Sequence, residues 1–337
     1  MAGFQAKEFL PAAVLERITT ARIAKPETAA RAAAQRRRRP RLTETGRLNL
    51  LAADHPARRV TAVGGNPLAL ADRHDYLARI VRVLLCEQVD GVMATMDILE
   101  DLLVLDGLLR KSSQRPLLDQ KLLIASLNRG GLAGVSWEMD DPLTGATAQS
   151  CAAWKLDGAK LLLRLCDDEP ASLKTLTACA QAINETNALR LPMFLEPLPV
   201  VKTESGYKVV KTAEALAAIV GVASALGDSS RYLWLKLPYC DNYEIVARAT
   251  TLPILLLGGE AAGDIRPLLG EIAAGLAAGA NVRGALVGRN VLYPGDEDPL
   301  VAATAVSGII HESRSVAEAL DAASAVRGRA LDWLAQA

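Results

Sequence analysis

The sequence predicts an α/β protein of the (β/α)8 TIM-barrel class, preceded by an N-terminal helical extension. From Leu48 onward, short apolar runs typical of buried strands alternate with longer helical patterns, as in proteins with a parallel sheet. Eight such units fit in roughly 260 residues, a number that closes a (β/α)8 barrel. A doubly wound sheet is the main alternative, but it normally has a glycine-rich turn after its first strand. The turn Asp54-His55-Pro56-Ala57-Arg58 lacks that GxGxxG pattern.

Residues 1–47 are expected to form the extension, and residues 48–337 the barrel. Between Glu8 and Arg39 the chain is rich in alanine and arginine, with apolar spacing compatible with one or two helices and a break at Pro26. The run Arg36-Arg37-Arg38-Arg39 ends at Pro40 and has no interleaved aromatic residues, which disfavours a nucleic-acid patch. We expect a solvated helix end there instead.

The predicted barrel strands are short apolar runs. In chain order they are Leu48–Ala53, Gly91–Ala94, Lys121–Ser126, Ala159–Leu165, Met193–Glu196, Tyr232–Leu237, Ile254–Leu257 and Gly284–Val287. Helical patterns separate most of them, among which the clearest are Asp72–Gln88, Glu169–Asn187, Thr212–Leu226 and Ala261–Ala278.

The composition excludes several classes of protein. Lysine plus arginine equal aspartate plus glutamate at 38 each, so no overall charge draws the chain to nucleic acid or to a membrane. The five cysteines form no CxxC pair, which fits reduced thiols and a cytoplasmic location. Three histidines without HExxH or paired-cysteine spacing predict no metal site. No apolar run is long enough to span a bilayer, and no signal-peptide pattern follows Met1.

Two lysines interrupt the apolar strands. Lys236 lies within Tyr232–Pro238, and Lys160 lies within Gly158–Leu163. A buried lysine must have a charged partner or lose its proton, and a deprotonated amine in a dry pocket is a nucleophile towards carbonyl groups. A structural ion pair is the alternative. Because one barrel layer takes side chains from alternate strands, the fourth and sixth strands should bring the lysines together, so that one amine loses its proton beside a cationic neighbour.

Other polar residues fall at the C-terminal ends of strands, where barrel enzymes hold their catalytic groups. Asp54 ends the first strand and Glu196 the fifth, and we expect them to supply counter-charge and proton transfer to the lysines. Arg164 follows Lys160 by four residues on the same strand face. It is expected either to bind an anionic group of the substrate or to pair with the Asp167-Asp168 run.

The last two strands lead into a predicted phosphate site, because the loops after the seventh and eighth strands hold phosphate in many barrels. Gly258 and Gly259 let backbone N–H groups approach an anion, whereas a simple turn is the alternative. One unit later, Gly288 precedes Arg289, whose guanidinium fork matches a phosphate group.

These segments resemble those of class I ketose-phosphate aldolases, which form a Schiff base. The resemblance runs from about Leu48 to Val291 and rests on the order and strand placement of five short motifs. They are Ala52-Ala53-Asp54-His55, Gly158-Ala159-Lys160, Phe194-Leu195-Glu196-Pro197-Leu198, Leu235-Lys236-Leu237-Pro238 and Val287-Gly288-Arg289-Asn290. The similarity is greatest to the tagatose-bisphosphate and deoxyribose-phosphate branch. Similar actinobacterial proteins are associated with inositol catabolism and 5-dehydro-2-deoxyphosphogluconate.

The resemblance implies a metal-independent and cofactor-free lyase that acts on a small phosphorylated sugar, as a homo-oligomer. It assigns the Schiff base to Lys236, acid/base chemistry to Glu196, assistance to Lys160 and Asp54, and phosphate binding to Gly259, Gly288 and Arg289. The chain departs from the family pattern in its arginine-rich extension, in Arg164 and in an insertion at 129–147. These departures affect the expected substrate rather than the reaction.

Two other functions remain open at this point. The first is a phosphosugar isomerase or decarboxylase barrel in which Lys236 is only an electrostatic anchor. The second is a non-catalytic metabolite sensor, which would have no need of the acid/base group Glu196.

Overall fold

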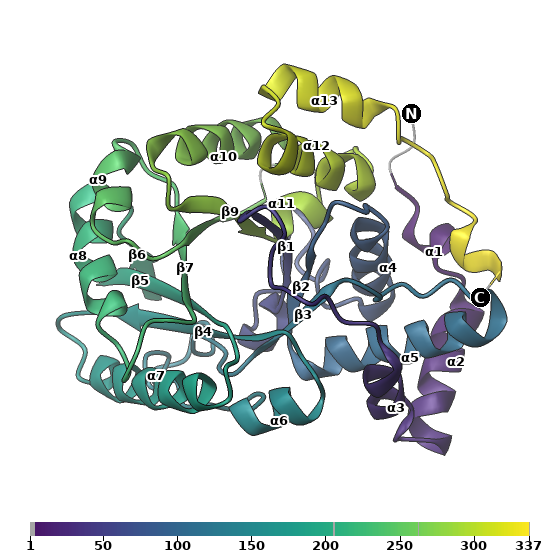
Figure 1. The fold of residues 1–337 in the computed structure, drawn as a ribbon, viewed down its shortest axis with the longest axis horizontal. Coiled ribbons are helices and arrows are strands. Elements are labelled where there is room, and N and C mark those ends of the chain that lie inside the picture. The colour runs from purple at the N-terminus through teal and green to yellow at the C-terminus, as the bar shows by residue number, and fades with distance from the viewer. Residues whose placement is uncertain (1–3, 205, 262, 337) are drawn as a thin grey trace.

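The computed structural model describes residues 4–204, 206–261 and 263–336. Its strands are β1 (Leu48–Ala53), β2 (Gly91–Ala94), β3 (Leu122–Ser126), β4 (Gly158–Leu165), β5 (Met193–Thr203), β6 (Gly206–Val209), β7 (Leu233–Pro238), β8 (Ile254–Leu257) and β9 (Val282–Val287). Eight of them are parallel and pair in the order β1-β2-β3-β4-β5-β7-β8-β9, and β9 pairs with β1 to close a barrel (Figure 1). The predicted (β/α)8 fold is therefore confirmed.

Helices surround the barrel and connect successive strands (Figure 1). They are α1 (Ala6–Phe9), α2 (Ala12–Ala24), α3 (Thr28–Gln35), η1 (His55–Arg58), α4 (Arg73–Leu84), α5 (Met96–Ser112), α6 (Ala148–Ala153), α7 (Ala171–Ala188), α8 (Ala213–Ser224), α9 (Tyr243–Arg248), α10 (Arg266–Ala278), α11 (Arg289–Leu292), α12 (Pro299–Glu312), α13 (Val316–Ser324) and η2 (Trp333–Gln336). The helix expected to begin at Ala261 begins at Arg266, and Ala262 lies outside the described residues. Within the described part of the chain, every helix is too short or too polar to traverse a bilayer.

The barrel interior is filled by its own small apolar cluster. Alternate residues of β1, namely Leu48, Leu50 and Ala52, point inward and join side chains from the other strands, such as Phe194 on β5. Residues of the opposite parity pack outward against the helices, as the two-residue period of a strand requires. Trp234 on β7 borders the interior cluster and lies 6.1 Å from Phe194, measured between ring centroids. This packed layer lies below Lys236 and forms an apolar floor for the site.

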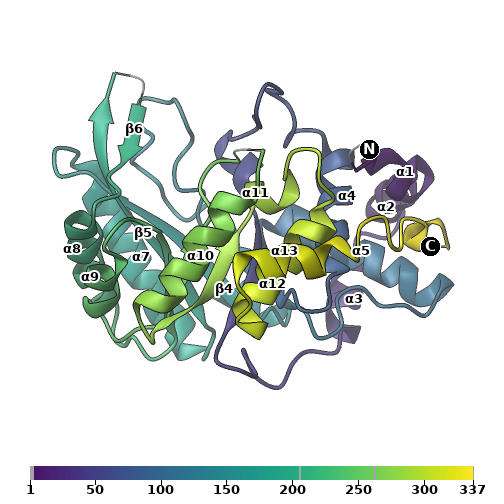
Figure 2. The same ribbon diagram turned by 90° about the horizontal axis from the view of Figure 1, so that it is seen from above.

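Strand β5 continues beyond the predicted end at Glu196. It runs to Thr203 and pairs with β6 in an antiparallel hairpin that projects from one end of the barrel (Figure 2). Proline has no N–H to donate to a strand ladder, and two prolines, Pro197 and Pro199, follow Glu196. Both prolines nevertheless lie within the strand and in register with β4.

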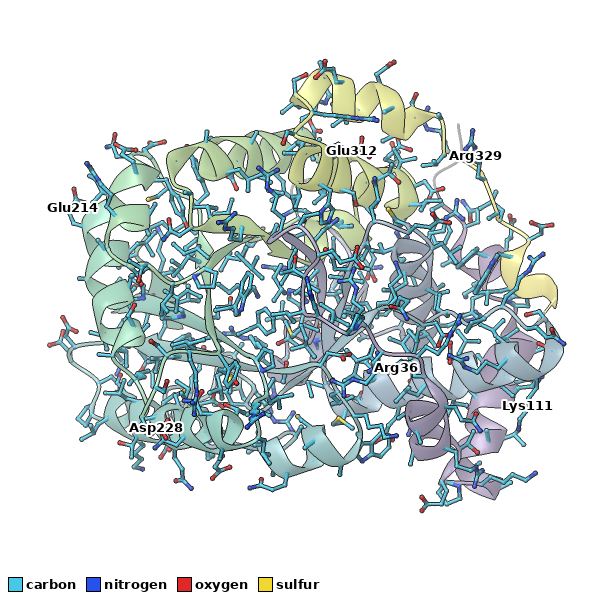
Figure 3. All side chains as sticks on the ribbon, in the orientation of Figure 1. Arg36, Lys111, Glu214, Asp228, Glu312 and Arg329 are labelled. Atoms are coloured by element: carbon cyan, nitrogen blue, oxygen red, sulfur yellow. The ribbon has the colours of Figure 1, made fainter. Side chains whose placement is uncertain are left out.

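The run Arg36–Arg39, which we call the arginine strap, crosses the opposite end of the barrel. The expectation of a solvated helix end is wrong, because α3 ends at Gln35 and each strap arginine pairs with an aspartate. Arg36 is buried beside α3, whereas Lys111 and Glu214 lie at the periphery (Figure 3). The aspartates precede β2, β3 and β4: Asp90 pairs with Arg39, Asp119 with Arg37, and Asp157 with both Arg36 and Arg38.

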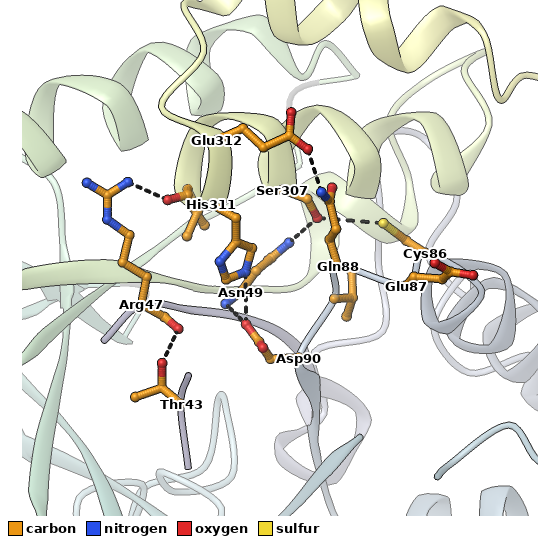
Figure 4. Close-up of polar contacts among 12 residues, drawn as sticks. Thr43, Arg47, Asn49, Cys86, Glu87, Gln88, Asp90, Ser307, His311 and Glu312 are labelled. Carbon is orange, nitrogen blue, oxygen red and sulfur yellow. Dashed lines mark hydrogen bonds and ion pairs between the residues drawn. The ribbon is translucent and has the colours of Figure 1, made fainter. Parts of the chain in front are cut away.

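A second polar cluster ties α12 to the same end of the barrel (Figure 4). Asp90 Oδ2 accepts hydrogen bonds from the backbone N–H of Asn49 at 2.7 Å and contacts His311 Nε2 at 3.0 Å. The Asn49 side chain donates to Ser307 on α12 at 2.8 Å. Because these groups lie at the N-terminal ends of the strands, they hold the scaffold together and leave the C-terminal ends free for chemistry.

Candidate active site

Lys160, Lys236, Glu196 and Asp54 meet at the C-terminal end of the barrel. Both lysines contact the same carboxylate oxygen, Glu196 Oε2, which lies 2.9 Å from Lys236 Nζ and 3.1 Å from Lys160 Nζ. Lys160 Nζ also donates to Asp54 Oδ2 at 3.0 Å. The expectation that alternate strands bring the two lysines together is therefore confirmed. Lys160 is 2% exposed and Lys236 6%, so the pairs are almost wholly removed from water.

The charges of the four groups stabilise one another. Burial opposes ionisation of Glu196, but the Lys236 and Lys160 ammonium groups outweigh it and lower the pKa of this carboxyl to about 2. Burial likewise opposes the charge on Lys160, yet Asp54 and Glu196 raise its pKa above the ordinary lysine value. Lys160 is therefore held as a cation by two carboxylates, whereas Lys236 is paired with one among the described residues.

Two residues that sequence reasoning did not assign lie close to Asp54, and one of them holds it. Ser126, the last residue of β3, donates a hydrogen bond to Asp54 Oδ2 at 3.0 Å and fixes that carboxylate. The sequence did hold a signal for Ser126, because it is a polar residue at the end of a predicted strand. His55 lies beside Asp54, and its Nδ1 is buried with no hydrogen-bond partner in the described structure. Burial, followed by the nearby cations Arg289 and Lys236, lowers the pKa of His55 to about 4 despite the opposing charge of Asp54, which keeps the ring neutral.

The predicted phosphate loops lie side by side. Asn290 Nδ2 donates to the carbonyl of Gly258 at 2.5 Å, which joins the loop after β8 to the loop after β9. Gly259 has φ +64°, a backbone conformation that favours glycine. A Cβ on Gly288 would lie 2.4 Å from the Ala52 carbonyl oxygen, so this close approach of β9 to β1 also requires glycine.

Arg289 begins α11 directly after Gly288. Its Nε is buried and has no hydrogen-bond partner among the described residues, and burial lowers the pKa of its guanidinium. A buried N–H without a partner costs free energy unless a ligand accepts from it. The guanidinium of Arg289 is therefore available to bind an anion.

Arg164 does not pair with the Asp167-Asp168 run, and that expectation is wrong. Its Nη1 donates to Glu138 Oε1 at 2.6 Å, and its Nη2 donates to the main-chain carbonyl of Glu138 at 3.1 Å. Glu138 lies in the insertion at 129–147, too far from Arg164 in the sequence to be identified as its partner. The guanidinium of Arg164 thus joins this insertion to the end of β4.

Within the described ranges, no group of three or more histidine, cysteine, aspartate or glutamate side chains is placed to hold a metal ion. A broad groove lies elsewhere, between α1 and the C-terminal segment, and its walls include Phe4, Phe9, Arg266 and Arg327. None of the predicted site residues lines that groove.

The chain is similar to several known proteins. The model of the Cgl0159-like family matches residues 46–307. The crystal structure of Cgl0159 from Corynebacterium glutamicum is 37% identical and has a TM-score of 0.84, over 90% of this chain and 99% of that chain. An uncharacterized aldolase of Saccharolobus solfataricus is 30% identical over 148 residues, or 43% of this chain, and the match spans about half (51%) of that protein.

More distant structures share the fold. A Schiff base-forming fructose-1,6-bisphosphate aldolase has a TM-score of 0.56 at 20% identity, over 84% of this chain and 100% of that chain. An archaeal fructose 1,6-bisphosphate aldolase has the same TM-score at 19% identity, over 84% and 99%. The resemblance to class I aldolases is thus confirmed for the fold, whereas the tagatose-bisphosphate branch and the inositol pathway stay predictions. The chain belongs to the Cgl0159-like family, and its barrel is similar to those of class I fructose-bisphosphate aldolases.

Proposed function

We propose that the protein is a class I aldolase that cleaves a ketose phosphate into dihydroxyacetone phosphate and an aldehyde. The observation that carries this proposal is the carboxylate oxygen of Glu196 shared by two buried lysines at the C-terminal end of a barrel. One lysine must stay charged and the other must become a free amine for imine chemistry. Lys160 has two carboxylate partners and remains the cation, so Lys236 is the amine that condenses with the ketone.

The reaction follows from these positions. The free amine of Lys236 adds to the ketone, water leaves, and the resulting iminium is an electron sink. A base removes the proton of the hydroxyl group on the second carbon from the iminium carbon. The bond between that hydroxyl-bearing carbon and the carbon next to the iminium carbon breaks, the aldehyde leaves, and the electron pair of the broken bond forms an enamine. Protonation of the enamine carbon and hydrolysis of the iminium release dihydroxyacetone phosphate and restore the lysine.

Glu196 is the proposed base. In the free protein two ammonium groups hold its pKa at about 2, which makes it a weak proton acceptor. When Lys236 becomes bonded to the substrate, it donates less to Glu196, so the basicity of the carboxylate rises at the step that needs it. The ion pair of Lys160 with Asp54 stays in place during this step.

For the substrate, we propose a ketose phosphate with its phosphate against Arg289 and the loops of Gly258, Gly259 and Gly288. The unpartnered Nε of Arg289 and the glycine backbone support this placement. The first compound to test is 5-dehydro-2-deoxyphosphogluconate. Cleavage between its ketone-bearing half and its carboxylate-bearing half would give dihydroxyacetone phosphate and 3-oxopropanoate.

Borohydride trapping tests the chemistry directly. Incubation with dihydroxyacetone phosphate and reduction should give a permanent adduct on Lys236, identified by peptide mass spectrometry. Lys236→Met should abolish the adduct, whereas Lys160→Met should reduce its yield without moving it. An adduct on Lys160 would reverse the assignment. If wild type turns over the substrate without an adduct, an isomerase or decarboxylase barrel is the better explanation, and binding without turnover would indicate a sensor.

A further inference from the structure

Arg58 is a second partly buried arginine at the C-terminal end of the barrel. It ends η1, the single turn that follows Asp54, and its side chain is 24% exposed. Its Nε is buried and has no hydrogen-bond partner among the described residues. Its nearest carboxylate oxygen, Glu138 Oε1, lies 3.7 Å from Nη2, which is an ion-pair distance but too long for a hydrogen bond.

Both carboxylate oxygens of Glu138 already accept hydrogen bonds from other groups. Oε1 accepts the 2.6 Å hydrogen bond from Arg164, and Oε2 accepts from the backbone N–H of Gly134 at 3.0 Å. The main-chain carbonyl of Glu138 accepts a further bond from Arg164. Arg164 therefore donates two hydrogen bonds to Glu138, whereas the Nε of Arg58, beside it, has no partner among the described residues.

Arg58 follows Asp54 by four residues in the turn η1, and the charges of the site act on its guanidinium. Burial and then the Arg164 guanidinium lower the pKa of Arg58. Glu196 and Asp54 are among the carboxylates that oppose this effect, so the guanidinium lies within the electrostatic reach of the lysine pairs. Arg289 instead follows β9, and after burial its charge is among those that lower the pKa of His55. Arg58 and Arg289 thus lie in different loops, one after β1 and the other after β9.

The turn that carries Arg58 is held in place before any ligand binds. Arg129 Nη1 donates to the carbonyl of Ala57 at 3.0 Å, and the backbone N–H of Ala133 donates to the carbonyl of Arg58 at 3.0 Å. Both donors belong to the insertion at 129–147. A donor fixed in this way loses little conformational entropy when it binds an anion.

We propose that Arg58 binds an anionic group, a phosphate or a carboxylate, at the end of the aldehyde half of the substrate. Arg164 takes the supporting role of holding Glu138, and with it the insertion, in position beside Arg58. The enzyme then selects substrates that are charged at both ends, with Arg289 at the ketose phosphate and Arg58 at the far end. This inference rests on the proposed aldolase function.

The test uses the aldol direction with dihydroxyacetone phosphate as donor and matched pairs of acceptors. Glyceraldehyde 3-phosphate is compared with glyceraldehyde, and 3-oxopropanoate with propanal, for wild type, Arg58→Gln and Arg59→Gln. Arg59 is the exposed neighbour, so Arg59→Gln removes the same charge from the same turn. Thermal melting checks that both variants fold.

Arg58→Gln should lower kcat/KM at least about tenfold for one or both anionic acceptors, because a charge-assisted hydrogen bond is lost. The neutral acceptors should change less than about twofold, and Arg59→Gln should resemble wild type with every acceptor. A loss confined to the phosphate or to the carboxylate identifies which group Arg58 binds. An equal fall with charged and neutral acceptors, or no fall, overturns the inference.

Two further measurements separate this inference from the proposed function. Borohydride trapping with dihydroxyacetone phosphate should give the same adduct in wild type and Arg58→Gln, since Arg58 does not contact the donor half. If no adduct forms even in wild type, the aldolase proposal fails and Arg58 is tested by calorimetric titration with inorganic phosphate and malonate. Weaker binding in Arg58→Gln alone supports the anion site, and equal affinity in all three proteins contradicts it.

Discussion

The arginine strap offers a sharp test of how buried and exposed ion pairs differ within one short segment. Arg36 and Arg37 are consecutive, but the Arg36 side chain is 1% exposed and that of Arg37 is 74% exposed. Arg36 donates to the carbonyls of Lys121 at 2.6 Å and Lys155 at 2.8 Å, and to Asp157 Oδ2 at 2.8 Å.

The expected loss of stability follows from these contacts. Removal of one partner of a buried ion pair costs roughly 3–5 kcal/mol, because the other charge is left without its counter-ion. Arg38 still contacts Asp157 and offsets part of this cost, while the buried carbonyl of Lys121 and the part-buried carbonyl of Lys155 each lose a donor. We therefore expect Arg36→Ala to lower the free energy of unfolding by about 3–4 kcal/mol. Arg37→Ala should cost less than about 1 kcal/mol, because the Arg37 side chain lies in solvent and Asp119 keeps its ion pair with Arg110.

Urea titrations followed by circular dichroism and by tryptophan fluorescence measure both variants. The free energies are comparable where the two signals give one transition. Added salt should shrink the small effect of Arg37→Ala and leave that of Arg36→Ala largely unchanged, since only exposed charges are well screened. Equal losses in the two variants, or a loss below about 1 kcal/mol for Arg36→Ala, would refute the reasoning.

Three further predictions concern the site. Arg289→Ala should raise KM for a phosphorylated substrate, with roughly 2–3 kcal/mol of binding lost; unchanged kinetics would leave this arginine without a role. Activity should persist in EDTA, because an iminium supplies the electron sink that a metal supplies in other aldolases; loss that zinc restores would contradict this. Gly288→Ala should lower the melting temperature, because its Cβ would meet the Ala52 carbonyl at 2.4 Å; a variant as stable as wild type would show that the strands separate easily.

Much of the barrel and the centre of the site could be predicted because their signals are local. Strand β1 begins and ends at the predicted residues, as do β2 and β8, since each is a continuous apolar run between polar segments. Lys160 and Lys236 stood out because a charge inside such a run has few physical explanations. Because alternate strands share a barrel layer, the fourth and sixth strands were enough to predict that the two lysines meet.

The remaining features depend on contacts between residues far apart in the sequence. Arg36 pairs with Asp157, and Arg164 with Glu138, so no local pattern distinguishes these arginines from solvated ones. Arg58 was visible in the turn after β1, but burial of its Nε depends on how the insertion at 129–147 packs over it. The extra length of β5 depends likewise on its pairing with β6.

The hairpin of β5 and β6 has a consequence for association between molecules. The barrel closes on itself, so its strands offer no edge, but β6 lies at the end of the sheet order and pairs with β5 alone in the described structure. An unpaired strand edge is a template on which another chain can add a strand. Here the edge is four residues long, and the exposed Lys202 and Lys208 place positive charges along the hairpin. Two such edges would repel each other and share few hydrogen bonds, so we expect any assembly between copies to use another surface.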